Sequence, residues 1–217
     1  MTKTRSEIIE KHKKNGVIFM DEESAFIDAE VTIGTGTKIA PNVHLVGNTV
    51  IGKDVSIGFN TEIENAEIGD GVKIRQSVIL DSKIGAGTTV GPFAYVRPNC
   101  VVGENVKLGD FVEIKNSNID EGTKVSHLTY IGDSDVGKNI NFGCGTITVN
   151  YDGKNKFRTT IEDNAFIGCN TNLVAPVTVK KNAFIAAGST ITDDVDEDSL
   201  AIARCRQTIK KDWRKNK

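Results

Sequence analysis

The chain has 217 residues, a formal net charge of −2 at pH 7 and 26% charged side chains, which suits one domain and excludes a strong overall field for nucleic acid or membranes. Its four cysteines are far apart in the sequence and follow no disulfide or zinc spacing, so we expect reduced thiols and no metal site. The charged first residues lack the apolar core of a signal peptide, and no stretch is apolar over the width of a bilayer. These features indicate a cytoplasmic protein.

The N-terminal segment predicts one short helix, from Ser6 to Asn15. Ser6 can cap its first turn, acidic residues favour its start, and lysines favour its end before Gly16. We assign residues 1–24 to this helix and a lead-in segment, and expect the helix to close one end of the unit that follows.

An aliphatic residue then recurs about every sixth position from Ile27 to Ile191. A period of six fits neither an amphipathic helix nor a hairpin, but it fits short strands joined by tight corners, with three strands to a coil. Stacked coils bury these residues in one core. The repeat predicts an all-β parallel solenoid over residues 25–194, with these buried anchors: Ile27, Ile33, Ile39, Leu45, Ile51, Ile57, Ile63, Ile68, Ile74, Ile79, Ile84, Val90, Val96, Val102, Leu108, Ile114, Ile119, Ile131, Val136, Ile161, Ile167, Leu173, Val179, Ile185 and Ile191.

The repeat breaks fully only once, over residues 149–160, where the segment NYDGKNK (150–156) has the composition of a loop. An insertion into a regular repeat often marks the binding face. Residues 195–217 form a predicted C-terminal arm that is basic from Arg204 onward. A solvated terminus is favoured over a nucleic-acid arm, because the basic residues do not continue onto the solenoid.

His127 is the candidate for chemistry among the three histidines. Strand alternation from Val125 would point its ring inward, so we expect it at a corner, where alternation fails. His12 and His44 lie far from the inserted loop in the sequence. Cationic and amide residues lie within about two coils of His127 or on the loop, as an anionic substrate would require. They are Arg97, Lys115, Tyr130, Asn141, Asn150, Tyr151 and Lys156.

Several motifs in order resemble one family, the acetyltransferase half of the bifunctional glucosamine-1-phosphate acetyltransferase / N-acetylglucosamine-1-phosphate uridyltransferase of bacterial cell-wall synthesis. The resemblance covers nearly the whole chain, from KHKKNG at 11–16 onward. Its most specific segments are GPFAYVRP (91–98), FVEIK (111–115), SHLTYIGD (126–133) and GTITVNYDG (145–153), extended by KF (156–157), LVAPV (173–177) and IAAGS (185–189).

The resemblance implies a left-handed β-helix shaped as a triangular prism, which assembles as a homotrimer with active sites shared between subunits. It implies acetyl-CoA-dependent N-acetylation of glucosamine-1-phosphate on the route to UDP-N-acetylglucosamine, without a metal. Nothing before Gly16 supplies the Gly-rich phosphate loop of the family's other half, so we expect no uridyl transfer from this chain. The chain is expected to be either a natural single domain or an excised half.

The resemblance also implies a role for each matching residue. His127 matches the catalytic base. The substrate-binding residues are Arg97, Lys115, Tyr130, Asn141 and Lys156; the cofactor-binding residues, for acetyl-CoA, are Cys144, Asn150, Tyr151, Cys169, Ala187 and Arg204. Family members commonly carry Ala and Ser in place of Cys144 and Cys169, and we favour tolerated small side chains there over an acetyl-cysteine.

The chemistry requires a base near pH 7, because a protonated amine cannot attack a thioester. We expect Glu113 to orient His127, and backbone N–H groups near Gly143 to Gly145 to stabilise the oxyanion. Three alternatives remain. They are a hexapeptide acyltransferase for another amine or a hydroxyl acceptor, a hexapeptide carbonic anhydrase, which needs three clustered histidines, and a non-catalytic trimeric paralogue.

Overall fold

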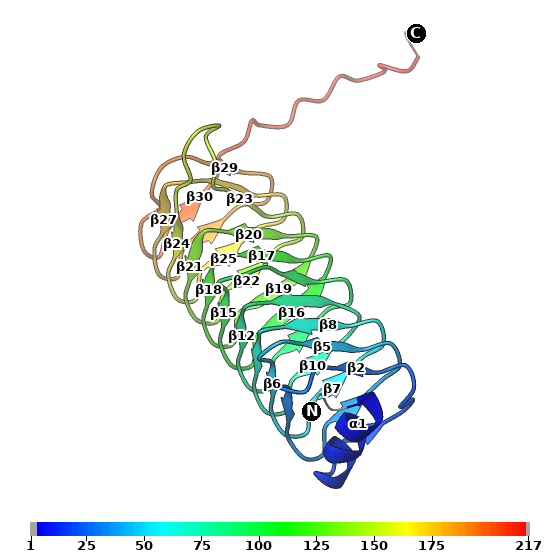
Figure 1. Cartoon of the computed structure of the whole chain (residues 1–217). Helices are drawn as coiled ribbons and strands as arrows, with labels where there is room; N and C mark the ends of the chain where they lie inside the picture. The colour runs from blue at the N-terminus through cyan, green and yellow to red at the C-terminus, as the bar shows by residue number, and fades with distance from the viewer. Residues whose placement is uncertain (1–3, 216–217) are drawn as a thin grey trace.

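The chain folds as a left-handed parallel β-helix, in which short strands form the three sides of a prism (Figure 1). The computed structural model describes residues 4–215. Each strand pairs in parallel with the strand three places along the chain, except that β28 pairs with β30 at the end of the solenoid, so each side of the prism is one sheet. We name the sheets A, B and C in the order in which the chain visits them.

Sheet A has 11 strands, sheet B has 10 and sheet C has 9 among the described residues. Sheet A comprises β1 (Ile18–Phe19), β4 (Lys38–Ile39), β7 (Ser56–Ile57), β10 (Lys73–Ile74), β13 (Thr89–Val90), β16 (Lys107–Asp110), β19 (Lys124–His127), β22 (Asn141–Phe142), β25 (Phe166–Ile167), β28 (Phe184–Ile185) and β30 (Leu200–Ala201). Sheet B comprises β2 (Phe26–Ile27), β5 (His44–Val46), β8 (Glu62–Glu64), β11 (Val78–Leu80), β14 (Tyr95–Val96), β17 (Glu113–Lys115), β20 (Tyr130–Gly132), β23 (Ile147–Val149), β26 (Asn172–Val174) and β29 (Thr190–Ile191). Sheet C comprises β3 (Thr32–Ile33), β6 (Val50–Ile51), β9 (Glu67–Ile68), β12 (Lys83–Ile84), β15 (Val101–Val102), β18 (Asn118–Ile119), β21 (Ser134–Val136), β24 (Thr159–Ile161) and β27 (Val177–Val179).

The interior of the prism is filled by the predicted anchors, and all of them are buried. The residue before an anchor usually points to solvent, because side chains alternate along even a two-residue strand. A second inward position lies two residues before each anchor and carries small or branched side chains such as Val31 and Thr37. The hydroxyl of Thr37 donates to the carbonyl of Gly52 at 2.9 Å, so a polar group is tolerated in the core.

Helix α1 (Arg5–Lys14) packs against the first coil through Ile8 and Ile9. The predicted cap at Ser6 is wrong, because Thr4 occupies the N-cap. Its side chain accepts the Glu7 N–H at 3.4 Å, and the Glu7 carboxylate accepts the Thr4 N–H at 2.7 Å. With this reciprocal capping box the helix begins at Arg5, one residue closer to the N-terminus than the expected start at Ser6.

The solenoid extends into both flanking segments assigned from the sequence. Strand β1 pairs with β4 inside the predicted 1–24 segment, and β30 pairs with β28 inside the predicted 195–217 arm. From Ile202 onward the described residues are exposed, and the arm leaves the body at the end opposite α1 (Figure 1). The last two residues of the predicted arm, and residues 1–3, lie outside the described residues.

The corner that leads from sheet A to sheet B, the A–B corner, contains a left-handed residue in every coil from β4 onward. In most coils this residue is Asn or Gly, which tolerate a positive φ. Three successive coils instead carry large apolar residues there: Phe93 (φ 58°), Phe111 (φ 54°) and Leu128 (φ 46°). They are 50–57% exposed, and the rings of Phe93 and Phe111 stack with centroids 5.3 Å apart. We call these three residues the corner ridge.

Candidate functional site

The site is built on a column of side chains that runs along the A–B corner, one residue per coil. Its members occupy the same register in successive coils, because each carbonyl accepts a hydrogen bond from the next coil. Leu128 N–H donates to Asp110 O (3.0 Å), Gly145 N–H to His127 O (3.4 Å), Asn170 N–H to Cys144 O (2.8 Å) and Gly188 N–H to Cys169 O (2.7 Å). The corner column therefore reads Asp110, His127, Cys144, Cys169 and Ala187.

His127 ends β19 at the corner, with 54% of its side chain exposed, which confirms the expected corner position. Its Nδ1 lies 2.6 Å from Oδ1 of Asp110. The hydrogen bond with His127 holds the pKa of the Asp110 carboxyl below its usual range. Because a carboxylate only accepts, Nδ1 carries the proton in this pair, and Nε2 is the ring nitrogen that can act as the acceptor in the neutral imidazole.

Glu113 does not orient His127, contrary to the expectation from the sequence. It accepts a hydrogen bond from Arg97 at 2.9 Å, on the outer face of sheet B. Asp110 takes the expected place because it lies opposite His127 in the β16–β19 pairing. The signal was present in the sequence as an acidic residue one coil before His127.

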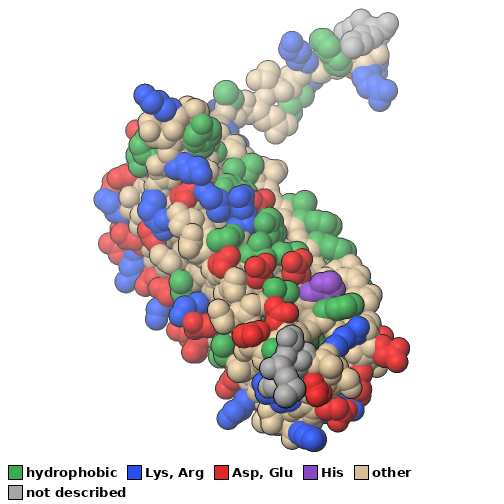
Figure 2. Space-filling view, in the orientation of Figure 1, with side chains coloured by type: hydrophobic (Ala, Val, Ile, Leu, Met, Phe, Trp, Pro, Cys, Tyr) green, Lys and Arg blue, Asp and Glu red, His purple; other side chains and the backbone are tan. Residues whose placement is uncertain are grey.

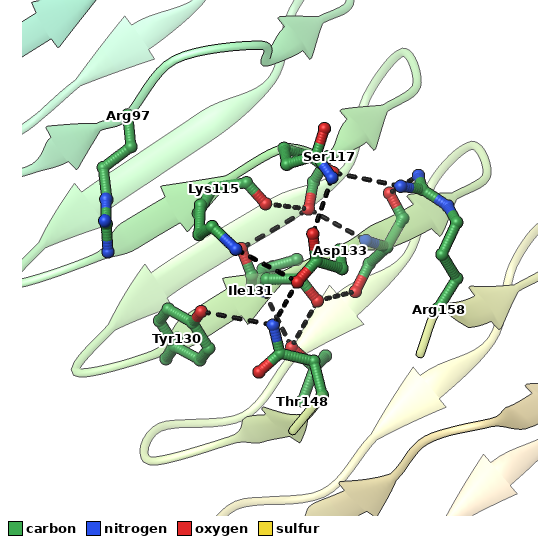
Figure 3. Close-up of polar contacts among 12 residues, drawn as sticks. Arg97, Lys115, Ser117, Tyr130, Ile131, Asp133, Thr148 and Arg158 are labelled. Atoms are coloured by element: carbon green, nitrogen blue, oxygen red, sulfur yellow. Dashed lines mark hydrogen bonds and ion pairs between the residues drawn. The ribbon is translucent and has the colours of Figure 1, made fainter. Parts of the chain in front are cut away.

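A second group of polar residues lies at the corner from sheet B to sheet C, the B–C corner, and is centred on Asp133 (Figure 3). Asp133 is 5% exposed and accepts from Lys115 at 3.2 Å, from Asn116 at 2.6 Å and from Asn150. Burial raises the pKa of Asp133, but the hydrogen bonds from Asn116, Asn150 and Lys115 lower it by more. The pKa of Asp133 therefore lies below its usual value. The sequence motif contained Asp133, but no role was predicted for it.

Three cationic side chains lie around this corner: Arg97, Lys115 and Lys156. Burial acts against the charge of Lys115, yet its contacts with Lys156 and Asp133 raise its pKa. The pKa of Lys156 is lowered, chiefly by Lys115 and also by Arg97. The neighbouring cations therefore disfavour the charged form of Lys156, and an anion bound at this corner would stabilise it.

The inserted loop carries Lys156 and projects from the side of the prism (Figure 1). Arg158 holds the end of the loop, where the chain re-enters the prism at β24. The guanidinium binds both carboxylate oxygens of Asp135 at 2.8 and 2.7 Å, and it donates to the carbonyls of Ser134 (3.0 Å) and Asn116 (3.2 Å). Lys and Arg side chains gather below the projecting loop on the face shown in Figure 2.

Tyr130 lies between the two corners. A side chain at Gly132 would meet the Tyr130 hydroxyl at 2.3 Å, so the ring lies along sheet B toward the B–C corner. Its hydroxyl is 3.5 Å from Nδ2 of Asn150. Asn141 lies apart from this group within the chain, on the outer face of sheet A beside Lys124.

The residues expected to bind acetyl-CoA fall into two groups. Cys144, Cys169 and Ala187 belong to the corner column, and Arg204 joins them because its Nε donates to Ala187 O at 2.9 Å. Asn150 instead lies 8% exposed against Asp133, and Tyr151 lies on the inserted loop, where its hydroxyl donates to Gly153 O at 2.6 Å. The structure does not bring these two residues together with the column within one chain.

The expected oxyanion donors are only partly free. Gly143 N–H donates to Ile167 O at 2.7 Å, and Gly145 N–H donates to His127 O. Of the three N–H groups, that of Cys144 alone has no hydrogen-bond partner in the described part of the chain. It lies one coil above His127 in the column.

Across residues 4–215, no three His, Cys, Asp or Glu side chains are grouped as a metal site would require. His12 is buried in α1, His44 lies in β5 and His127 in β19, so the histidine cluster of a carbonic anhydrase is not formed within the chain. None of the described helices has the length and apolar character needed to cross a membrane.

Comparison with known proteins agrees with this geometry. The family model for the bacterial transferase hexapeptide (six repeats) matches residues 30–65, 81–116 and 158–193. Over 209 residues the chain is 57% identical to the bifunctional protein GlmU of Clostridioides difficile (strain 630), which covers 96% of this chain and 46% of that protein. GlmU of Acetivibrio thermocellus is 58% identical over 96% of this chain and 45% of its own length. The chain thus spans about half the length of these relatives.

Among solved structures, the UDP-N-acetylglucosamine acyltransferase of Francisella novicida matches with a TM-score of 0.59 at 21% identity, over 86% of this chain and 67% of that one. At this identity the likeness concerns the fold alone. More than half of the residues are identical to those of GlmU over nearly the whole of this chain. The chain therefore belongs to the bacterial hexapeptide-repeat transferases and corresponds to the hexapeptide-repeat half of GlmU.

Proposed function

We propose that the chain transfers the acetyl group of acetyl-CoA to the amine of glucosamine-1-phosphate, which yields N-acetylglucosamine-1-phosphate. One observation carries this proposal: a carboxylate-bound histidine and a group of cations lie at opposite ends of the same strands of sheet B. His127 lies just before β20 and Asp133 just after it, so the base and the cations flank the same short strand. The sugar phosphate would lie along this strand, with its amine toward His127 and its phosphate toward Lys115 and Lys156.

The phosphate would bind at the B–C corner. Lys115 and Lys156 offer two charges whose repulsion an anion would relieve, and Asp133 holds Lys115 in place. Arg97 carries a guanidinium that can bind two phosphate oxygens at once. Its present partner Glu113 is 40% exposed, so exchanging this partner for a phosphate costs little desolvation. Tyr130 would lie beneath the sugar ring.

His127 would take the proton from the substrate amine. Asp110 accepts from Nδ1, which fixes the ring and leaves Nε2 as the acceptor for that proton. The adjacent carboxylate also stabilises the imidazolium that forms. This arrangement supports direct transfer: the neutral amine would attack the thioester carbonyl, His127 would take a proton from that nitrogen, and the C–S bond would break with return of the proton to the departing CoA thiolate.

The acetyl donor would lie along the corner column. Cys144, Cys169 and Ala187 have small side chains that leave the corner open, and Arg204 supplies a cation at its far end for the phosphates of the donor. Acetyl-CoA, when bound there, supplies a thioester carbonyl. The Cys144 N–H, which has no hydrogen-bond partner in the described residues, lies in the coil next to His127 and would donate to the developing oxyanion.

We also propose a homotrimer, with each site completed by a neighbouring copy. The corner ridge supports this proposal, because it exposes three large apolar side chains directly beside Asp110 and His127. An enclosed site would bring Asn150 and Tyr151 of one copy near the column of another, which a single chain does not do. The remaining parts of the proposal are a cytoplasmic location and no uridyl transfer by this segment.

Removal of the base tests the proposed function. We expect His127→Ala to lower kcat for acetylation of glucosamine-1-phosphate about 10²–10⁴-fold, the usual contribution of a positioned general base. The circular dichroism spectrum should not change, because the ring is exposed. His44→Ala is the matched control, because it also removes an exposed imidazole, from β5 of sheet B, and it should retain activity. Near-normal turnover of His127→Ala would refute the assignment.

Exchange of Asp110 for Asn tests the orientation of His127. The amide can donate to Nδ1 and so stabilise the wrong tautomer, and we expect a lower kcat with little change in KM for the sugar phosphate. Glu113→Gln should act differently and change KM, because Glu113 touches Arg97. A kcat defect in Glu113→Gln together with normal turnover in Asp110→Asn would reverse the roles given to these carboxylates.

Lys156→Ala tests the phosphate site. Loss of one charged hydrogen bond, worth about 1.5–3 kcal/mol, should raise KM for glucosamine-1-phosphate roughly 10- to 150-fold. The effect should be much smaller with unphosphorylated glucosamine. Lys154→Ala on the same loop is the control and should leave both values near wild type. Equal losses with both acceptors would argue that Lys156 does not contact the phosphate.

Phe111→Asn tests the corner ridge as a contact between copies. Asn prefers the left-handed conformation, so the variant should fold at least as well as the parent while it loses an apolar contact. We expect sedimentation to show fewer trimers and more monomers. Val101→Thr, a polar exchange at an exposed position on sheet C, should remain trimeric. An unchanged trimer in Phe111→Asn would place the interface elsewhere.

A further inference from the structure

Cys144 and Cys169 are neighbours in the corner column, although the inserted loop separates them in the sequence. Strands β22 and β25 pair in register, Asn141 with Phe166 and Phe142 with Ile167. The same register continues two residues further to the cysteines, since Asn170 N–H donates to Cys144 O at 2.8 Å.

The two coils are in close contact at this point. A Cβ atom on Gly143 would lie 2.4 Å from the backbone nitrogen of Cys169, so only glycine fits there. Cα atoms at the same register of adjacent parallel strands lie about 4.8 Å apart. That separation falls within the range of about 4.4–6.8 Å that a disulfide bridges. The spacing of the two coils therefore meets the Cα criterion for a disulfide between these residues.

The thiols are also accessible. Both are free, Cys169 is exposed and Cys144 is partly exposed. Cys100 differs because it is buried in the core, where desolvation raises its pKa. Cys205 is exposed on the C-terminal arm beyond Arg204. Among the four cysteines, only Cys144 and Cys169 occupy adjacent positions of one column.

We propose that Cys144 and Cys169 form a reversible disulfide, a modification site on the donor side of the proposed active site. A small-molecule disulfide is the oxidant. One cysteine thiolate attacks it, forms a mixed disulfide and releases one small thiol. The second cysteine thiolate then displaces the other small thiol, so the protein loses two hydrogens and two electrons and the oxidant becomes two thiols.

The bond would act on donor binding, and this consequence rests on the proposed function. Cys144 lies between His127 and Cys169, and its N–H is the free donor of the corner. A cross-link would pull both side chains across the column and fix the coil that carries this N–H. We expect the oxidised protein to lose acetyl transfer and to regain it after reduction.

The test treats the reduced full chain with oxidised glutathione and maps tryptic peptides without reduction. The expected product joins residues 139–154 to residues 159–180, with a mass lower by two hydrogens than the sum of the two peptides. Cys144→Ala and Cys169→Ala should each abolish it and yield only a glutathione adduct on the remaining cysteine. Cys205→Ala should still form it. Adducts on both cysteines without a cross-link, no reaction at either cysteine, or a link from Cys169 to Cys205 would overturn the site.

Activity is measured separately, as acetylated product by mass spectrometry before and after dithiothreitol. Loss of transfer on oxidation and recovery on reduction would support control of the donor site. Full activity of the cross-linked protein would overturn that control. A chain that forms the cross-link but never acetylates glucosamine-1-phosphate would refute the proposed function and leave the thiol pair standing, so the two failures are distinguishable.

Discussion

Backbone hydrogen bonding between coils in strict register is the constraint on which the rest of the structure depends. It stacks each position of a coil on the same position of the next, so residues far apart in sequence become a column. Inside the prism the columns are aliphatic and form the core. At the A–B corner, the same register aligns Asp110, His127, Cys144, Cys169 and Ala187. The core and the candidate site are thus two results of one geometry, and neither can shift without the other.

The register also explains how an insertion is tolerated. The extra loop leaves the prism after β23 and returns before β24, so the added residues lie outside the stacked coils. Two anchors hold its ends: Asn150 donates to buried Asp133, and Arg158 binds Asp135 and two carbonyls. A buried carboxylate is costly unless several donors satisfy it, and Asp133 has three. Asp133 also holds Lys115, so the support of the loop and the positive charge at the B–C corner both depend on the Asp133 side chain.

The sequence predicted what depends on period and failed where contacts cross coils. The aliphatic anchors expected from the period are all buried, and His127 lies at a corner, as expected where alternation fails. Asp110 escapes the sequence analysis, which expects Glu113 beside His127, because the sequence does not show which residue of the preceding coil pairs with His127. The sequence separates Cys144 from Cys169 because the loop lengthens that coil beyond the usual period. It does not reveal that the N–H groups of Gly143 and Gly145 already donate to carbonyls of neighbouring coils.

The corner ridge links the backbone geometry to assembly. A left-handed conformation costs a residue with a side chain on the order of 1 kcal/mol, and Phe93, Phe111 and Leu128 adopt it where most other coils use Asn or Gly. In the isolated chain these side chains are about half exposed. Full burial of a Phe or Leu side chain contributes about 1.5–3 kcal/mol, so the exposed half leaves further apolar burial to be gained at each position. A surface that covers the ridge would therefore more than offset the strain. Because the ridge adjoins Asp110 and His127, a covering copy would also exclude water from the proposed base.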